Sequence, residues 1–300
     1  MLLTPADIGA EIYLNNTTVR GLDPGLRDIF VACDGVGTGA DPSRQRHRIR
    51  KTSTSEYYQL SEFKSAAIKR AKHDRANVDA HRLISNVPST RTCNWDQFNE
   101  VLRYIFRNFE AIKGYYTTGL KKLKFHNYRN EQKALTEMCK RLFTGSRKYQ
   151  EGNPDIQQAH LKKWKPLAPR DHASEAERPI VIVFGSARFG GLRGNVSSPT
   201  KIFRTALLNY IKSTRRNQPN SRNYAVIIDE YFTSQICPRC HTRSTSNQRD
   251  NSNMVIHPVL NCQTCNTRWN RDYTASLKLR SIFLYMAANE NNRPEEFQPK

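Results

Sequence analysis

Two pairs of cysteines near the end of the chain constrain its folding most strongly. Cys237 and Cys240 form one CxxC unit, Cys262 and Cys265 form a second, and 21 residues separate the two units. Each CxxC turn directs two sulfur atoms towards one point, so two turns can surround one ion with four thiolates in a tetrahedron. A redox dithiol would need only one CxxC unit, and the spacing therefore favours zinc. We expect residues 237–268 to form a small zinc ribbon that is stabilised by a closed, structural metal site.

Two histidines are alternative ligands for this zinc. His241 and His257 lie near the cysteine pairs in the sequence, but four thiolates already complete a tetrahedral site. The other three cysteines, Cys33, Cys93 and Cys139, occur singly, as expected for a chain in a reducing compartment.

The charge of the chain indicates its class of partner. It carries 48 Lys and Arg against 27 Asp and Glu, a formal net charge of +21. Such a field attracts polyanions, of which nucleic acid is the commonest. No apolar run approaches the roughly 18 residues of a membrane-spanning helix, and the first residues lack the basic leader of a signal peptide. We therefore expect an intracellular protein that binds nucleic acid and no membrane.

The distribution of apolar residues predicts an α/β fold. Residues 17–35 contain two β-rich runs around Asp23-Pro24-Gly25, which predicts a hairpin, and residues 47–58 are a candidate third strand. The apolar runs 179–185 and 224–232 predict strands that are buried on both faces.

Helices are predicted between and after these two buried strands. Residues 198–216 have helical periodicity, with Ser198 as the expected cap and Pro199 at the first helical position. A closing helix has one apolar face formed by Ala275, Leu279, Ile282, Phe283 and Met286. A meander, then parallel strands joined by a helix, then a final helix is the layout of an RNase H-like mixed sheet.

The long middle region, from about residue 56 to 175, is predicted to be a helical insertion. Apolar residues recur there at helical spacing, and basic clusters such as 121–129 lie between and after them. We expect most aromatic side chains of this region to lie in its core, with base stacking as the alternative. Residues 165–179 have the composition of a linker.

Three carboxylates follow or precede the predicted elements. Asp23 ends the first strand, Glu230 ends a buried strand, and Asp272 lies just before the closing helix. Hydrolysis of a phosphodiester by two magnesium ions requires such acidic ligands close together. Each residue also has a simpler interpretation, as a turn former, a solvent-exposed strand end and a helix cap respectively. Together, in a chain of this charge, they favour a metal-dependent nuclease.

Residues 21–28, 229–240 and 262–276 resemble the RuvC motifs and zinc ribbon of the TnpB and Fanzor transposon-associated nucleases, which are similar to compact type V CRISPR effectors. The resemblance implies RNA-guided, Mg²⁺-dependent DNA cleavage, with DNA and a guide RNA as partners. It also implies that Asp23, Glu230 and Asp272 are the catalytic ligands of Mg²⁺, and it implies a nuclear location. In TnpB the middle glutamate ends the strand that corresponds to residues 179–185, where this chain has Gly185.

Glu230 is similar to the shifted glutamate of the Fanzor branch, which we therefore favour. Neighbouring strands lie about 4.8 Å apart, so a carboxylate on the next strand remains within reach of the same metals. Asp229 is the competitor, and strand alternation would send it to the opposite face. We expect the carboxylates of Asp23, Glu230 and Asp272 to converge, with the ribbon projecting from the same side of the sheet.

Two positions depart from the family pattern. Thr274 stands where the family usually has Asn. Only 22 residues precede Asp23, whereas family members carry a large amino-terminal portion that holds guide RNA and target DNA, so we expect this chain to lack that portion.

The predicted domain organisation divides the RuvC-like core into three parts. In chain order the segments are the first part of the core (1–55), a helical insertion and linker (56–178), the second part of the core (179–236), the zinc ribbon (237–268), the closing part of the core (269–290) and a tail (291–300). A catalytically inactive or truncated nucleic-acid-binding relative is the alternative function. An autonomous structure-selective nuclease, like the junction resolvases that share the fold, is a third.

Overall fold

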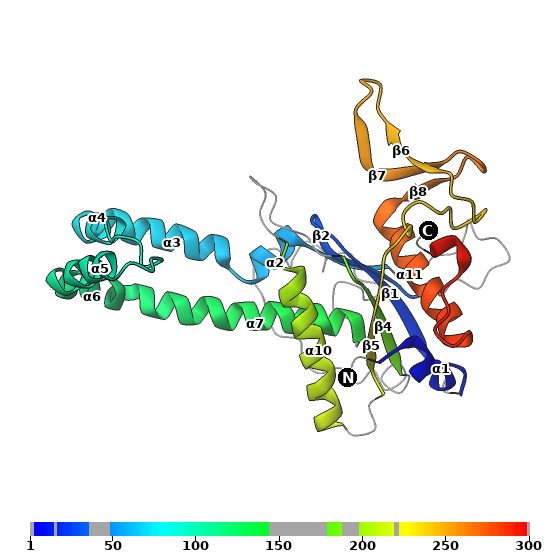
Figure 1. Ribbon diagram of the computed structural model, residues 1–300, viewed down its shortest axis with the longest axis horizontal. Helices are drawn as coiled ribbons and strands as arrows, with labels where there is room; N and C mark the ends of the chain where they lie inside the picture. Colours follow the sequence, from blue (N-terminus) through cyan, green and yellow to red (C-terminus); the bar gives the residue numbers. More distant parts are fainter. Residues whose placement is uncertain are drawn as a thin grey trace, which may run out of the picture. The chain divides into compact units, whose positions relative to one another are not determined.

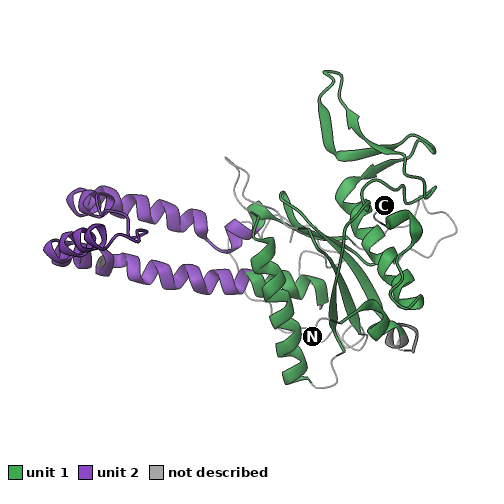
Figure 2. Ribbon diagram, viewed as in Figure 1, with its two compact units in different colours: residues 1–56, 135–300 green, residues 57–134 purple. Residues whose placement is uncertain are grey.

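The computed structural model describes residues 3–14, 17–35, 49–143, 179–187, 198–218 and 222–298. It divides the chain into two compact units (Figure 2). Unit 1 comprises residues 1–56 and 135–300, and unit 2 comprises residues 57–134. Residues 165–178 of the predicted linker lie outside the described residues.

Unit 1 is built on a mixed five-stranded sheet with the order β3-β2-β1-β4-β5 (Figure 1). Strand β2 is antiparallel to β1 and β3, whereas β4 is parallel to β1 and β5. The strands are β1 (Thr18–Pro24), β2 (Asp28–Cys33), β3 (Ile49–Ser53), β4 (Ile180–Gly185) and β5 (Tyr224–Ile228). An antiparallel meander joined to parallel strands confirms the predicted RNase H-like sheet.

Strand β4 lies between β1 and β5, and all of its residues are buried. Its run of apolar residues fits this position, because helices cover both faces of a parallel sheet. On one face, Phe203 of α10 (Thr200–Asn217) stacks on Phe30 with ring centroids 4.9 Å apart and contacts Phe184 at 6.2 Å. The other face is covered by α11 (Arg271–Ala288) and α1 (Pro5–Leu14) (Figure 1).

The core beneath α11 is formed by buried aliphatic and aromatic residues. Its members are Ile8, Val19, Val181, Val183, Val226, Ile228, Ile236, Leu279, Ile282, Phe283 and Phe297. The predicted apolar face of the closing helix therefore lies against the sheet, with Met286 at its margin.

Helix α11 lies very close to β1 at Gly21. A Cβ atom at this position would lie 1.9 Å from the carbonyl oxygen of Ser276 and 2.8 Å from the backbone nitrogen of Arg280. Because both are backbone atoms, no rotamer change can relieve the overlap. Only glycine permits this separation between helix and strand.

The predicted cap of α10 is wrong. The helix begins at Thr200, its N-cap is Pro199, and Ser198 makes no capping hydrogen bond. Instead, the Ser198 hydroxyl donates a hydrogen bond of 2.7 Å to the carbonyl oxygen of Gly25. Ser198 therefore links the start of α10 to the turn between β1 and β2 by a hydrogen bond.

The segment between β3 and β4 is helical as far as it is described, as predicted. Its helices are α2 (Thr54–Leu60), α3 (Phe63–Ala76), α4 (Val78–Ser85), α5 (Trp95–Arg107), α6 (Phe109–Tyr115), a π-helical turn (Tyr116–Leu120) and α7 (Lys121–Phe143). Unit 2 contains all of these except the start of α2 and the end of α7. Within unit 1, buried Arg141 near the end of α7 donates to Thr52 Oγ1 at 3.0 Å and pairs with Glu56 at 2.8 Å.

The aromatic residues of unit 2 range from buried to exposed, with Tyr58, Phe63, Phe98 and Tyr104 between these limits. Tyr57 and Tyr115 are buried, as expected for core residues. Six others are exposed, so the expectation that most aromatics of this region form its core is wrong for Trp95, Phe106, Phe109, Tyr116, Phe125 and Tyr128.

A second, three-stranded antiparallel sheet follows β5 in the chain and projects away from the five-stranded sheet (Figure 1). Its strands are β6 (Thr245–Arg249), β7 (Val255–Cys262) and β8 (Arg268–Asn270). Helix α11 begins directly after β8, and a short 3-10 helix (Glu295–Phe297) follows α11. Among the described residues, no helix combines the length and apolar character needed to cross a bilayer.

Replacing Gly21 by alanine should strongly destabilise unit 1. The added methyl group overlaps backbone atoms of α11, so we expect the free energy of unfolding to fall by about 3 kcal/mol or more, measured by urea denaturation. Gly114→Ala is the matched control, because no atom lies within 4 Å of a Cβ atom there. Since Gly114 is helical, this control should leave stability unchanged or raise it by up to about 1 kcal/mol. Equal effects of the two substitutions would contradict the described contact between α11 and β1.

Candidate active site and four-cysteine centre

Asp23 lies near the carboxyl end of β1, the central strand of the five-stranded sheet. Side chains alternate along a strand, so Asp23 shares with Gly21 the face that α11 covers. Its backbone pairs with that of Val31 on β2, and Val31 pairs in turn with Lys51 on β3. The Asp23 carboxylate is half-buried beneath α11.

Glu230 follows β5 rather than ending it. The strand stops at Ile228, earlier than the predicted run of residues 224–232, so strand alternation does not decide between Asp229 and Glu230. It is also the edge strand of its sheet, and only two of its five residues are buried, so the predicted burial on both faces is wrong for β5. Asp229 is exposed, and its Oδ1 accepts a hydrogen bond from the backbone N–H of Tyr231 at 3.2 Å. Glu230 is half-buried, and its Oε1 accepts a hydrogen bond from the backbone N–H of Ala187 at 3.2 Å.

The Glu230 carboxylate occupies the space above Gly185. A Cβ atom at residue 185 would lie only 1.8 Å from Glu230 Oε1. Gly185 is the next residue after Phe184, which pairs with Leu22, the neighbour of Asp23. Glu230 therefore places its carboxylate where a side chain on β4 would begin, beside the end of β1.

Asp272 lies in the first turn of α11 and is half-buried. The Asn270 side chain caps this helix by accepting a hydrogen bond from the backbone N–H of Tyr273 at 3.1 Å. Asp272 is therefore not the cap, which was its simpler interpretation. Its charged neighbours are the carboxylate of Asp28 and the exposed cations Arg27, Lys51 and Arg271.

Asp23 interacts electrostatically with both Glu230 and Asp272, although among the described residues the three carboxylates do not form a tight ligand group like that of the four cysteines. Burial, followed by repulsion from Glu230 and Asp272, raises the pKa of Asp23 well above its usual value. Burial also raises the pKa of Glu230 to about 7, although the N–H of Ala187 opposes this increase. The pKa of Asp272 is raised by burial and by Asp28, against the opposing effect of Arg271. A divalent cation would relieve this repulsion, and carboxylate oxygens are the ligands that Mg²⁺ prefers.

The four cysteines of the ribbon also converge. Their sulfur atoms all lie within 4.8 Å of one another. The Sγ atoms of Cys237 and Cys265 are 3.6 Å apart, and those of Cys240 and Cys262 are 3.5 Å apart. Four thiolates at about 2.3 Å around one zinc have sulfur–sulfur separations of roughly 3.8 Å. The cluster could therefore bind zinc in a closed tetrahedral site.

The two CxxC turns have the same backbone geometry. In the first, the N–H of His241 donates to the carbonyl oxygen of Cys237 at 3.0 Å, and the N–H of Cys237 donates to that of Thr242 at 3.0 Å. In the second turn, Asn266, Cys262 and Thr267 make the equivalent pair of bonds, also at 3.0 Å.

The residue after each CxxC unit has a left-handed backbone, with φ of 57° at His241 and 51° at Asn266. The repeated pattern CxxC-[His/Asn]-Thr was therefore a further signal in the sequence for two equivalent turns.

Hydroxyl groups surround the sulfur atoms. Thr242 Oγ1 lies 3.0 Å from the Cys240 sulfur, and Ser244 Oγ lies 3.2 Å from that of Cys262. Burial alone would raise the pKa of Cys262, but hydrogen bonds from Ser244 and from backbone N–H groups outweigh it and lower the pKa to about 5. Cys262 thus favours the thiolate, the form that binds metal. Burial has the opposite effect on Cys237 and raises the pKa of its thiol to about 11.

The alternative ligand His241 contacts α11 and does not join the sulfur cluster. Its Nδ1 lies 3.4 Å from the Nζ atom of buried Lys278 on α11. In the described parts of the chain, the convergent metal-ligand group contains the four cysteines and neither His241 nor His257.

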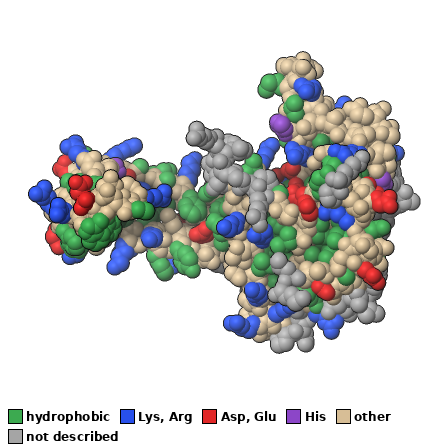
Figure 3. Space-filling view, viewed as in Figure 1, with side chains coloured by type: hydrophobic (Ala, Val, Ile, Leu, Met, Phe, Trp, Pro, Cys, Tyr) green, Lys and Arg blue, Asp and Glu red, His purple; other side chains and the backbone are tan. Residues whose placement is uncertain are grey.

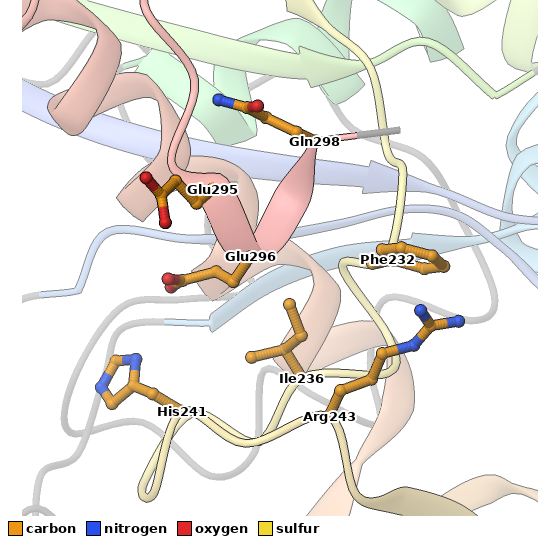
Figure 4. A pocket seen from close by; sticks show the side chains of 7 residues that line it. All are labelled: Phe232, Ile236, His241, Arg243, Glu295, Glu296 and Gln298. Carbon is orange, nitrogen blue, oxygen red and sulfur yellow. The ribbon is translucent and has the colours of Figure 1, made fainter. Parts of the chain in front are cut away.

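A pocket of about 440 Å³ lies between the first CxxC turn and the 3-10 helix, and Figure 4 shows its lining side chains. These are Phe232, Ile236, His241, Arg243, Glu295, Glu296 and Gln298. The guanidinium of Arg243 lies 3.5 Å above the centre of the Phe232 ring. None of the three candidate catalytic carboxylates lines this pocket, so it is separate from the candidate active site.

The cysteine centre should contain one zinc ion per chain, measured by plasma mass spectrometry of the purified protein. This method also distinguishes zinc from iron, which accepts four thiolates as well. Cys240→Ser should remove most of the zinc and lower the melting temperature, because metal binding contributes directly to folding of the ribbon. Exposed Cys93 provides the control Cys93→Ser, which should retain the metal. A metal-free native protein would refute the zinc assignment.

Glu230→Gln should stabilise the metal-free protein above neutral pH. The pKa of Glu230 is about 7 in the folded chain, against a usual value of 4.5, so ionisation of the native carboxyl is unfavourable. The cost of ionising Glu230 lowers the free energy of unfolding progressively as the pH rises from about 4.5 to 7. This cost is absent below both pKa values. In EDTA at pH 8 we expect a gain of roughly 2 kcal/mol, against almost none at pH 4. The exposed control Glu100→Gln should show no such difference, and a pH-independent effect of Glu230→Gln would contradict the shifted pKa.

Comparisons with known proteins support part of the predicted relationship. Residues 220–279 match the family model described as "Cas12f1-like, TNB domain". The matched segment includes β5, Glu230, the four cysteines and Asp272. No curated protein has a significant match to the chain.

Among solved structures, the chain is similar to the mini-RNA-guided endonuclease CRISPR-Cas_phi3, with 11% sequence identity and a TM-score of 0.43. The match covers 93% of this chain and 47% of that protein, so the chain spans about half its length. The family match over residues 220–279 supports a relationship of this segment to TnpB/Cas12-like proteins.

Proposed function

We propose that this chain is the RuvC-type nuclease domain of an RNA-guided DNA endonuclease of the TnpB/Cas12-like family, on the Fanzor branch. Asp23, Glu230 and Asp272 are its catalytic metal ligands, and Cys237, Cys240, Cys262 and Cys265 bind structural zinc. The position of the Glu230 carboxylate, directly over Gly185 at the end of β4, is the observation that carries the proposal. The Glu230 carboxylate, from the segment after β5, occupies the space that a TnpB-type glutamate side chain at residue 185 would need. This arrangement is the physical reason for favouring the Fanzor-type position of the glutamate.

The donor set fits magnesium. Burial and then repulsion from Glu230 and Asp272 raise the pKa of Asp23, which a bound cation would offset. When bound there, two Mg²⁺ ions supply an activated water and stabilise the leaving oxygen of the phosphodiester. Asp23 interacts with both other carboxylates and is therefore the central ligand. The N–H of Ala187 holds the Glu230 carboxylate in its orientation.

Cations beside the carboxylates favour a polyanionic substrate. Arg27, Lys51 and Arg271 are exposed, and all three act on Asp272. Guanidinium and ammonium groups at these positions would hold the phosphates on either side of the scissile bond. The net charge of +21 provides the longer-range attraction for DNA and RNA.

The match of residues 220–279 to a Cas12f1-like domain supports the RNA-guided part of the proposal. In RNA-guided effectors, base pairing between guide and target reads the sequence, while the protein contacts backbone and shape. Guide RNA and target DNA are therefore the proposed partners, and a nuclear location is proposed from the resemblance to Fanzor proteins.

Purified chain should cleave plasmid or single-stranded DNA in Mg²⁺ but not in EDTA, and sequencing of co-purified RNA should identify a guide. Asp23→Asn should reduce cleavage to background because it removes the central ligand. Gly185→Ala should slow cleavage about 10–100-fold, since the added methyl group displaces the Glu230 carboxylate. Gly114→Ala, which lies in unit 2 away from the carboxylates in sequence and leaves space for its methyl group, should cleave like the native chain.

Other outcomes distinguish the competing functions. Tight binding of nucleic acid without cleavage, unaffected by Asp23→Asn, would favour a catalytically inactive relative. Cleavage of branched DNA without bound RNA would favour an autonomous structure-selective nuclease.

A further inference from the structure

The first turns of α7 expose two aromatic side chains to solvent. Phe125 is 62% exposed and Tyr128 is 61% exposed, whereas Tyr57 of the same unit is 2% exposed. Residues three apart on a helix are neighbours on its surface, so the two rings lie on one face. Two adjacent aromatic rings in water are unfavourable, which points to a ligand for this face.

Helix α7 also has a buried side within unit 2. Glu131 accepts a hydrogen bond of 3.1 Å from the hydroxyl of buried Tyr57. Ala134 is fully buried, and nine residues after Phe125 it lies on the opposite side of the helix from that ring. Phe125 therefore points away from the buried side, and Tyr128 lies between Phe125 and that side, three residues before Glu131.

Positive charge surrounds the two rings. Lys121, Lys122, Lys124 and Arg129 are all exposed, and residues 121–130 contain no Asp or Glu. Within the described chain, no carboxylate lies at ion-pair distance from any of the three lysines. Unit 2 as a whole has 15 Lys and Arg against 7 Asp and Glu. In Figure 3 many of these cationic side chains lie beside hydrophobic ones on its surface.

We propose that this surface, termed the α7 stacking face and defined by Lys121, Lys124, Phe125, Tyr128 and Arg129, binds single-stranded nucleic acid. Unpaired bases stack on the two rings, and the neighbouring cations bind the phosphates. A duplex keeps its base faces inside its own stack and would use the cations alone. The surrounding charge also disfavours a second copy of this cationic chain as the occupant.

Binding in EDTA tests this proposal separately from catalysis. Fluorescence anisotropy would compare a labelled 20-nucleotide oligothymidine with a blunt 20-base-pair duplex. The double variant Phe125→Leu/Tyr128→Leu keeps apolar side chains and helix propensity but removes both aromatic faces. Its affinity for the single strand should fall about 10–100-fold, since stacking contributes substantially per base, while its affinity for the duplex should change less than about twofold.

Two further variants complete the design. Lys121→Gln/Lys124→Gln should weaken binding of both ligands and reduce the salt dependence, because each phosphate contact contributes to its slope. Trp95→Leu is the matched control, since Trp95 is an exposed aromatic of unit 2 that is followed by Asp96 and not by a basic cluster. It should bind like the native chain. Circular dichroism of each variant verifies that the helices are retained.

Three outcomes would overturn the proposal. Unchanged affinity of the leucine double variant would exclude stacking. An equal loss of affinity for single strand and duplex would show that the face binds both through its charge and not through base stacking. A change of oligomeric state with intact binding would identify the face as a contact between copies. Asp23→Asn should abolish cleavage yet retain single-strand binding, so failure of the nuclease proposal and failure of this one are distinguishable.

Discussion

The close contact between α11 and β1 at Gly21 is the constraint on which unit 1 depends. Because residue 21 has no side chain, the backbone at Ser276 can lie almost directly against the strand. This contact brings the first turn of α11, with Asp272, to the end of β1, which carries Asp23. It also encloses the apolar core between the sheet and the helix. The short distance between α11 and β1 thus contributes to the stability of unit 1 and also positions two carboxylates of the candidate site.

The candidate active site is electrostatically unfavourable in the absence of a cation. Burial raises the pKa values of all three carboxylates, and repulsion from neighbouring carboxylates adds to it. The cations near Asp272 offset only part of this effect. A chain selected only for stability would avoid such a cluster, because each ionised carboxylate weakens the fold near neutral pH. The surrounding core supplies the free energy that keeps them together. This opposition between local strain and global stability is typical of metal-binding and catalytic sites.

The ribbon lies in the chain between two of these carboxylates. Glu230 precedes Cys237 by seven residues, and β8 leads into α11 without a connecting loop, two residues before Asp272. The sulfur cluster holds the two ends of the ribbon together, and the two CxxC turns make equivalent hydrogen bonds. The buried contact of Lys278 with His241 further joins α11 to the first turn. A folded ribbon therefore restrains the segments that carry Glu230 and Asp272.

The sequence by itself determined the features that depend on local chemistry. The two CxxC units, the buried run of β4, and carboxylates near the ends of elements are visible without coordinates because spacing and hydropathy encode them. Only the tertiary structure decided that Glu230, and not Asp229, turns towards Gly185, because β5 ends before either residue. It also showed that Ser198 hydrogen-bonds to Gly25 in the turn between β1 and β2 instead of capping α10. Helical periodicity could not reveal that Phe125 and Tyr128 are exposed, since burial depends on which distant segments cover each face.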